Sequence, residues 1–167
     1  MNDILREPAS MGRIEKIRVF SRKQAEKFDP PKGKCYAWIS ITTPGDEPAY
    51  IPTRKPYDVG IKRVSFHDID DGEAGGVDIN GEPYVAPDMQ HAREIYSFVR
   101  WNIMALDELY IHCDAGISRS AGVAAALSKI FLDTDEEFFK APYYPNRLIY
   151  RMILEVHDKQ GDVGTHP

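Results

Sequence analysis

Cysteine, long apolar runs and net positive charge are all scarce in this sequence. Its 167 residues include two cysteines, Cys35 and Cys113, which excludes a disulfide framework and suits a reducing compartment. No run is long and apolar enough to span a bilayer, and the first ten residues lack the apolar core of a secretion signal. The net charge of −5 argues against nucleic acid or an acidic membrane as the main partner. We therefore expect one soluble, cytoplasmic domain over residues 1–167, with flexible ends at 1–11 and 161–167.

One stretch carries most of the chemistry that the sequence offers. Residues 108–112 predict a short buried strand, and a helix rich in small residues is predicted to begin at Ser120. Between them lies a tight loop that Cys113 opens and Arg119 closes. Backbone N–H groups at such a helix start, together with the helix dipole, form a site for a phosphate-sized dianion. The same field favours the thiolate form of Cys113, which is the form that attacks an electrophile.

Arg119 suits the same ligand, because its planar guanidinium can bind two phosphoryl oxygens at once. A competing interpretation is a structural cysteine beside a buried histidine at a strand end, since free cysteine is one of the most buried residue types. That interpretation leaves Arg119 and Ser120, at their offsets from Cys113, without an explanation.

The run HCDAGISRS, from His112 to Ser120, resembles the phosphate-binding loop (P-loop, residues 113–119) of the cysteine-dependent protein tyrosine phosphatases. It is most similar to the dual-specificity branch, of bacterial or phage type. The resemblance implies an α/β fold with a mainly parallel central sheet, helices on both faces, and the P-loop between a strand and a helix. It also implies that Cys113 is the nucleophile, that Arg119 binds phosphate, and that Ser120 stabilises the thiolate as a leaving group. His112 would set the orientation of the cysteine, and Gly116 would permit the turn.

The mechanism that the resemblance implies has two steps and needs no metal or organic cofactor. The Cys113 thiolate attacks phosphorus while an acid protonates the leaving oxygen, and water then releases phosphate from the phosphocysteine. The Arg119 side chain and the loop amides would bind the phosphoryl oxygens. The substrate-binding residues would be Asp114, Ala115, Gly116, Ile117, Ser118 and Arg119.

The variable positions of the loop carry no lysine, whereas a phosphoinositide or a triphosphate-bearing RNA end would favour further cations. The sequence therefore favours phosphotyrosine or phosphoserine/threonine in proteins, or small aryl phosphates, with inhibition by phosphate-like oxyanions. Asp114 would disfavour the thiolate if its side chain pointed inward, so we expect it to point outward. The sequence does not indicate the oligomeric state.

In the resembled family, an aspartate on a loop after an upstream apolar strand protonates the leaving group. Residues 61–66 predict such a strand, and it leads to Asp68, Asp70 and Asp71. We favour Asp68, at the strand end, as the general acid, with Asp70 second and Asp71 third. The three aspartates could instead form a turn or a divalent-cation site, although no further ligand pattern supports a metal.

Asp68 lies farther upstream of Cys113 than the acid does in compact dual-specificity phosphatases. The Gly-rich, acidic residues 72–87 account for this difference as an insertion. The insertion is either a mobile lid or a surface loop, and long loops of this composition favour the surface loop.

Strands and helices alternate in the rest of the sequence. Period-two patterns predict strands at residues 12–20, 35–42 and 61–66, with a further short one at 49–51. Cys35 is assigned to the core, and Phe98 and Trp101 to core or rim packing. Helices are predicted at residues 21–28, 88–106, 120–131, 134–141 and 147–156.

Four polar residues are predicted to cap helices: Ser21, Asp88, Thr134 and Asn146. Asn146 follows a proline, and this pair resembles one before the last helix of dual-specificity phosphatases. Capping is the expected role of Asn146, and a contact that helps to hold the P-loop arginine or serine is its alternative role.

Two alternatives to a phosphatase remain open. A phosphate-binding module without turnover would keep Cys113 and Arg119 but lack a competent acid, and the sequence position of Asp68 leaves this possible. A sulfurtransferase of the rhodanese kind also uses a cysteine loop before a helix, but the Arg119-Ser120 pair and the aspartates speak against it.

Overall fold

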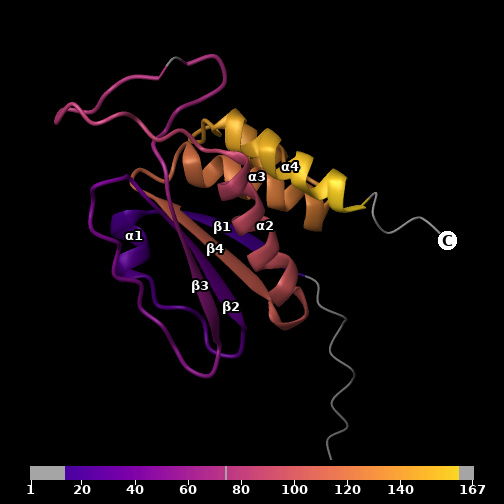
Figure 1. Ribbon diagram of the computed structural model, residues 1–167. Helices are drawn as coiled ribbons and strands as arrows, with labels where there is room; N and C mark the ends of the chain where they lie inside the picture. The colour runs from indigo at the N-terminus through magenta and orange to yellow at the C-terminus, as the bar shows by residue number, and fades with distance from the viewer. Residues whose placement is uncertain (1–13, 74, 162–167) are drawn as a thin grey trace, which may run out of the picture.

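Four parallel strands form one sheet in the computed structural model, which describes residues 14–73 and 75–161 (Figure 1). The strands are β1 (Lys16–Ser21), β2 (Tyr36–Thr42), β3 (Asp58–Ser65) and β4 (Glu108–Cys113). Their order in the sheet is β1-β4-β2-β3, so β4 and β2 lie at the centre. β4 is therefore hydrogen-bonded on both sides, and it is the strand that leads into the P-loop. The predicted α/β fold with a parallel sheet is confirmed.

Helices follow or connect the strands and continue after the P-loop. They are α1 (Arg22–Lys27), α2 (Met89–Asn102), α3 (Arg119–Leu132) and α4 (Arg147–Gly161), with short 3₁₀ helices η1 (Ile103–Ala105) and η2 (Glu136–Phe139). Among the described residues, none of these helices combines the length and the apolarity needed to cross a bilayer.

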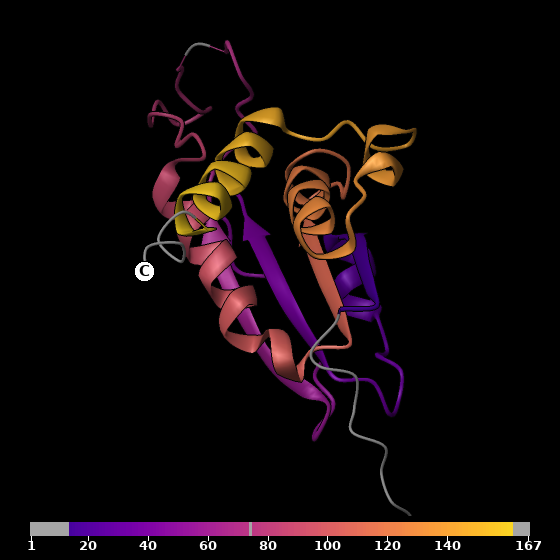
Figure 2. The ribbon, with the colours of Figure 1, turned by 90° about the vertical axis from the view of Figure 1, so that its right-hand side faces the viewer.

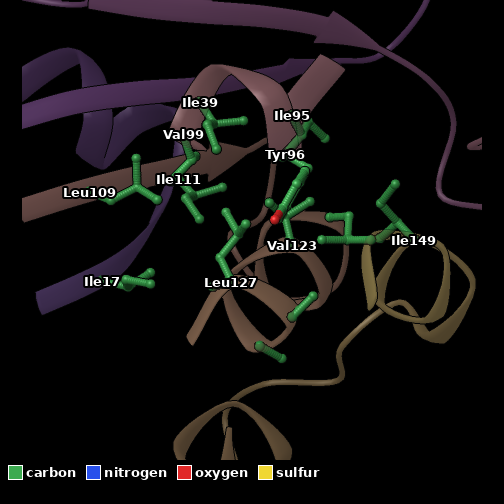
Figure 3. Packing of buried hydrophobic residues seen from close by; sticks show 14 of the residues in the cluster. Ile17, Ile39, Ile95, Tyr96, Val99, Leu109, Ile111, Val123, Leu127 and Ile149 are labelled. Carbon is green, nitrogen blue, oxygen red and sulfur yellow. The ribbon is translucent and has the colours of Figure 1, made fainter. Parts of the chain in front are cut away.

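Three helices, α2, α3 and α4, cover one face of the sheet (Figures 1 and 2). Because successive side chains of a strand point to opposite faces, β4 directs Leu109 and Ile111 into this layer. Figure 3 shows them packed against Val99 of α2 and Val123 and Leu127 of α3. This large core fixes α3, and with it the start of the helix at the P-loop.

The opposite face of the sheet is covered by α1 and by the loop after β2. Its core is aromatic, and Trp38 and Tyr110 pack there with ring centroids 5.1 Å apart. Helices therefore lie on both faces as expected, although one face has only a short helix. The predicted strand at 49–51 is wrong, because these residues form coil whose buried Ala49 and Ile51 pack into this core.

Three of the four predicted helix caps are confirmed. Ser21 forms a full capping box with Gln24, and Asp88 and Asn146 accept N–H bonds at the starts of α2 and α4. The capping box at Thr134 is wrong, since the segment there is the 3₁₀ helix η2, without a side-chain cap. Four residues followed closely by Pro142 are too few for a regular α-helix.

Two further expectations need correction, and a third is not tested. Trp101 is 87% exposed, because it lies two residues after the buried Val99 and so on the opposite side of α2, whereas Phe98 packs on the core as expected. Cys35 precedes β2 and is only half-buried. The predicted flexible ends and residues 12–13 lie outside the described residues, except Gly161, which ends α4.

Candidate active site

The P-loop lies where the central strand β4 meets α3. Cys113 is the last residue of β4, directly opposite Ser21 of β1, and Arg119 is the first residue of α3. The loop turns tightly against β1: Gly116 has φ +70°, and a Cβ atom on it would lie 2.5 Å from the backbone nitrogen of Ser21. Only glycine combines this conformation with so close an approach.

The Cys113 thiol is buried at the base of the loop with two hydrogen-bond partners. Its Sγ atom lies 3.0 Å from the Ser120 Oγ atom and accepts a bond of 3.3 Å from the Gly116 backbone N–H. Both groups can donate to sulfur, and both therefore stabilise negative charge on it. This geometry suits a thiolate that acts first as a nucleophile and then as a leaving group.

The Arg119 guanidinium is held by three different segments of the chain. Its Nη1 atom donates to the Thr43 Oγ1 atom and to the Phe66 carbonyl, each at 2.9 Å. Its Nη2 atom donates to the Asp114 Oδ2 atom at 3.0 Å. Thr43 follows β2 and Phe66 follows β3, so the ends of neighbouring strands fix the guanidinium.

The expectation that Asp114 points outward is wrong. Its carboxylate faces Arg119 and also accepts a bond of 2.6 Å from the Thr43 hydroxyl. Partial burial alone would raise the pKa of Asp114, but the bonds from Thr43 and Arg119 and the arginine charge outweigh it and lower this pKa. Attraction to an arginine on the same loop explains the inward orientation.

His112 supports the backbone at Cys113. Its Nε2 atom lies 2.7 Å from the Ser40 Oγ atom, and its Nδ1 atom lies 3.4 Å from the Cys113 carbonyl. A carbonyl only accepts, so we assign the proton to Nδ1 and let Nε2 accept from Ser40. Burial lowers the pKa of His112, which keeps the ring neutral at neutral pH.

The three candidate acids have separate surroundings. Asp68 is exposed, and its Oδ1 atom accepts bonds from the Ser118 hydroxyl at 2.7 Å and from the Asn146 amide at 2.9 Å. Asp70 accepts backbone N–H bonds at the start of α4, and Asp71 pairs with Arg151. Asp68 alone of the three therefore contacts the P-loop.

A metal site formed by these aspartates is not supported. Within residues 14–73 and 75–161, no group of three or more His, Cys, Asp or Glu side chains is placed to hold a metal ion.

Asn146 links residues 67–71, which carry the candidate acids and are called the acid loop below, to α4. Its Oδ1 atom caps the Ile149 N–H, and its Nδ2 atom donates to Asp68 and, at 2.9 Å, to the Ile69 carbonyl. Its side chain therefore holds the acid loop rather than Arg119 or Ser120. The backbone N–H of Asn146 bonds the Ser118 carbonyl at 3.0 Å, which ties the P-loop to the same junction.

The described residues of the insertion, 72–73 and 75–87, project as an arm beyond the strand ends (Figure 1). Its base pairs with His67, whose backbone N–H donates to the Val85 carbonyl at 2.7 Å and whose ring accepts from the Val85 N–H at 2.9 Å. The Tyr84 ring packs on the same histidine at 4.8 Å. Ile79, near the tip, is fully exposed.

Sequence reasoning missed Thr43 and Ser40. Ser40 belongs to β2, and Thr43 follows it. β2 is far from the P-loop in sequence but pairs in the sheet with β4, the strand that leads into the P-loop. The available signal was their position near the carboxyl end of a central parallel strand, where sites of α/β proteins form.

No protein-family model and no curated protein sequence matches this chain. Its fold is similar to that of the human tyrosine phosphatase-like serine/threonine/tyrosine-interacting protein, with a TM-score of 0.57, 14% identity, and coverage of 86% of this chain and 92% of that one. Tk-PTP in its active form gives a TM-score of 0.47 at 15% identity over 86% and 92% of the two chains. PTPMT1 gives 0.48 at 16% identity over 91% and 96%. The chain has the tyrosine phosphatase-like fold that its P-loop predicted.

Proposed function

We propose that this chain is a cysteine-dependent phosphatase that hydrolyses phosphomonoesters through a phosphocysteine intermediate. One observation carries the proposal: the Cys113 Sγ atom lies within hydrogen-bond distance of both Ser120 Oγ and Gly116 N at the start of α3. The tyrosine phosphatase-like fold supports it. The whole chain would act as one domain, in a reducing compartment such as the cytoplasm, where a thiolate persists.

In the first step the Cys113 thiolate attacks phosphorus, and the bond between phosphorus and the leaving oxygen breaks. Asp68 gives that oxygen a proton, so that it leaves as an alcohol or phenol. Arg119 and the amides of residues 114–119 bind the three other phosphoryl oxygens. The negative charge of the thiolate therefore ends on the Asp68 carboxylate, and the phosphoryl group stays a dianion.

In the second step water attacks the phosphocysteine. Asp68, now a carboxylate, takes a proton from the water, and the bond between sulfur and phosphorus breaks. Ser120 then donates to the departing thiolate from 3.0 Å. Phosphate leaves, and neither step requires a metal or a cofactor.

Asp68 is the acid that the contacts favour. Its bond from Ser118 places it on the P-loop, and its exposure leaves room for a leaving group. Asp70 and Asp71 make contacts with α4 that would be lost if either side chain moved to the leaving group.

Phosphorylated tyrosine, serine or threonine in proteins is the substrate class that we propose, with small phosphomonoesters as further substrates. Ile117 and Tyr144, 40% and 77% exposed, are joined by a backbone bond of 3.0 Å at the rim of the loop. These apolar groups can contact a peptide or an aryl ring. Oxyanions that resemble phosphate should inhibit.

The test is turnover of p-nitrophenyl phosphate, a phosphotyrosine peptide and a phosphoserine peptide. Cys113→Ser should reduce turnover to background. Asp68→Asn should lower kcat by about a hundredfold, and more on phosphoserine, whose alkoxide is the poorer leaving group. Asp70→Asn is the matched control and should retain turnover of the aryl phosphate.

Wild-type protein that binds vanadate without turning over any of these substrates would contradict the proposal. A phosphate-binding module of the same fold would then be the correct function.

A further inference from the structure

A basic groove lies beside the P-loop, between β1 and α1. Its volume is about 560 Å³, and the cations that line it are Arg18, Lys23 and Lys27. The Arg18 guanidinium lies 5.0 Å from the centroids of both the Phe20 and the Phe28 rings, which holds it in the wall of the groove. The groove therefore combines aromatic surface with three positive charges.

These positive charges are not neutralised by nearby carboxylates. Among the described residues, none of the three cations forms a salt bridge. Asp29, the carboxylate that lines the groove, is paired with Arg54 instead. Although the whole chain is acidic, this groove attracts anions.

The junction of β1 and α1, which lies between the two walls of the groove, contacts the P-loop. Ser21, which follows the strand part of the groove, lies opposite Cys113, and the Arg22 N–H donates to the Asp114 carbonyl at 3.1 Å. Figure 1 shows α1 at the end of the sheet where β4 enters the P-loop. From this junction, three strand residues lead back to Arg18 and about one and a half helical turns lead on to Lys27, so these cations lie within about 10 Å of it along the backbone. An extended peptide bound at the P-loop would cover that distance in about three residues.

The opposite border of the P-loop has the opposite charge. Ser118 contacts Asp68, and residues 67–87, which include the arm, contain six acidic residues and no lysine or arginine. An acidic peptide segment would be repelled on that side and attracted on the α1 side. The two borders together therefore favour one direction of binding.

We propose that the groove between β1 and α1 docks an acidic segment of the phosphoprotein substrate. The proposal rests on the proposed phosphatase function and adds a specificity to it. Aspartate or glutamate residues about three to five positions from the phosphorylated residue would lie against Lys23, Lys27 and Arg18.

The experiment compares phosphopeptides that carry Asp/Glu, Ala or Lys at three to five positions on either side of one phosphotyrosine. Wild type should show kcat/KM about tenfold higher for the peptide with acidic residues on one of the two sides than for the alanine peptide. The difference should come from a lower KM. Lys23→Glu with Lys27→Glu should abolish or invert this preference and leave turnover of p-nitrophenyl phosphate unchanged. Added salt should weaken the wild-type preference, since the groove is open to solvent.

Arg100→Glu with Lys159→Glu is the matched control, because it makes the same change in net charge on α2 and α4. It should keep the preference. Lys23→Gln with Lys27→Gln removes the charges without reversing them, and should remove the preference in a folded protein even if the reversed variant unfolds.

Fluorescence anisotropy with the Cys113→Ser variant separates docking from catalysis. Tighter binding of the acidic peptide, lost with the α1 substitutions, supports the groove even if no turnover is found. Equal dissociation constants for the three peptides would overturn the groove proposal and leave the phosphatase proposal standing.

Discussion

At the scale of single residues, Arg119, Asp114 and Thr43 form a closed set. Thr43 accepts a bond from Arg119 and donates one to Asp114, which in turn accepts from Arg119. This set fixes the direction of the guanidinium before a substrate arrives. It also places a carboxylate close to the proposed phosphate site, where its charge would oppose a dianion.

Asp114→Asn should therefore bind oxyanions more tightly. The substitution removes a negative charge, while Thr43 and Phe66 still hold Arg119 through Nη1. We expect the inhibition constant of orthovanadate to fall about threefold to tenfold, measured by competition with p-nitrophenyl phosphate. Asp133→Asn, at the end of α3, is the control. Weaker inhibition would mean that Asp114 acts mainly by orienting the arginine.

His112 should make stability depend on pH. Burial lowers its pKa in the folded chain, so below about pH 6.5 the unfolded chain binds the proton first. Its contribution is complete above that pH and is lost as the pH falls toward the lowered pKa. Urea unfolding from pH 7 to pH 5 should show a smaller loss of stability for His112→Asn, with His157→Asn as a control for loss of a ring. An unchanged slope would contradict this.

The sequence predicted the residues of the site that are close together in the chain. Cys113, Gly116, Arg119 and Ser120 belong to one run, and a strand, a loop and a helix placed in that order determine their geometry. The direction of Asp114 was harder to predict, because besides Arg119 it depends on Thr43, which follows β2 and is far away in the sequence.

At the scale of elements, the contact between α3 and α4 determines how Asp68, the proposed acid, reaches the P-loop. Gly122 of α3 faces the start of α4, and a Cβ atom on it would lie 2.4 Å from the Asn146 carbonyl oxygen. Asn146 in turn holds Asp68. The sequence predicted both helices and the Asn146 cap. The contact between Asn146 and Asp68, by contrast, follows from how the helices pack.

Gly122→Ala should destabilise the protein despite the better helix propensity of alanine. Alanine gains up to about 1 kcal/mol within a helix, whereas overpacking costs about 1–3 kcal/mol and here displaces backbone. We expect a net loss of about 1–2 kcal/mol in urea unfolding and lower turnover, because Asn146 moves. Gly161→Ala, with no atom within 4 Å of its added Cβ, is the control and should change stability little. Equal stability of the two variants would show that α4 shifts freely.

At the scale of the whole molecule, the sheet order brings the parts of the site together. With β4 next to both β1 and β2, the end of β4 meets α1 on one side and Thr43 on the other. The alternation of strands and helices predicted a parallel sheet. The sequence did not show the strand order. It therefore did not show which residues bind Arg119 or that a groove lies beside α1.

The arm at residues 72–87 is the part of the molecule that the sheet does not explain. Its inner contacts are local: one bridge joins Val77 and Pro83, and Asp78 accepts the N–H groups of Asn80 and Glu82. At its base, Tyr84 and Val85 contact His67, and the Glu73 carboxylate accepts the Asp70 N–H at 2.8 Å. These contacts favour a surface loop over a lid.

Replacing residues 75–83 with two glycines should therefore leave the free energy of unfolding within about 0.5 kcal/mol of wild type, as is usual for surface changes. Turnover of p-nitrophenyl phosphate should also be unchanged, because Tyr84, Val85 and their contacts with His67 remain. Tyr84→Ala in the full chain is the comparison, since it removes the ring that packs on His67, the residue before Asp68. A large loss of turnover on shortening, with stability retained, would instead show that the arm closes over the P-loop.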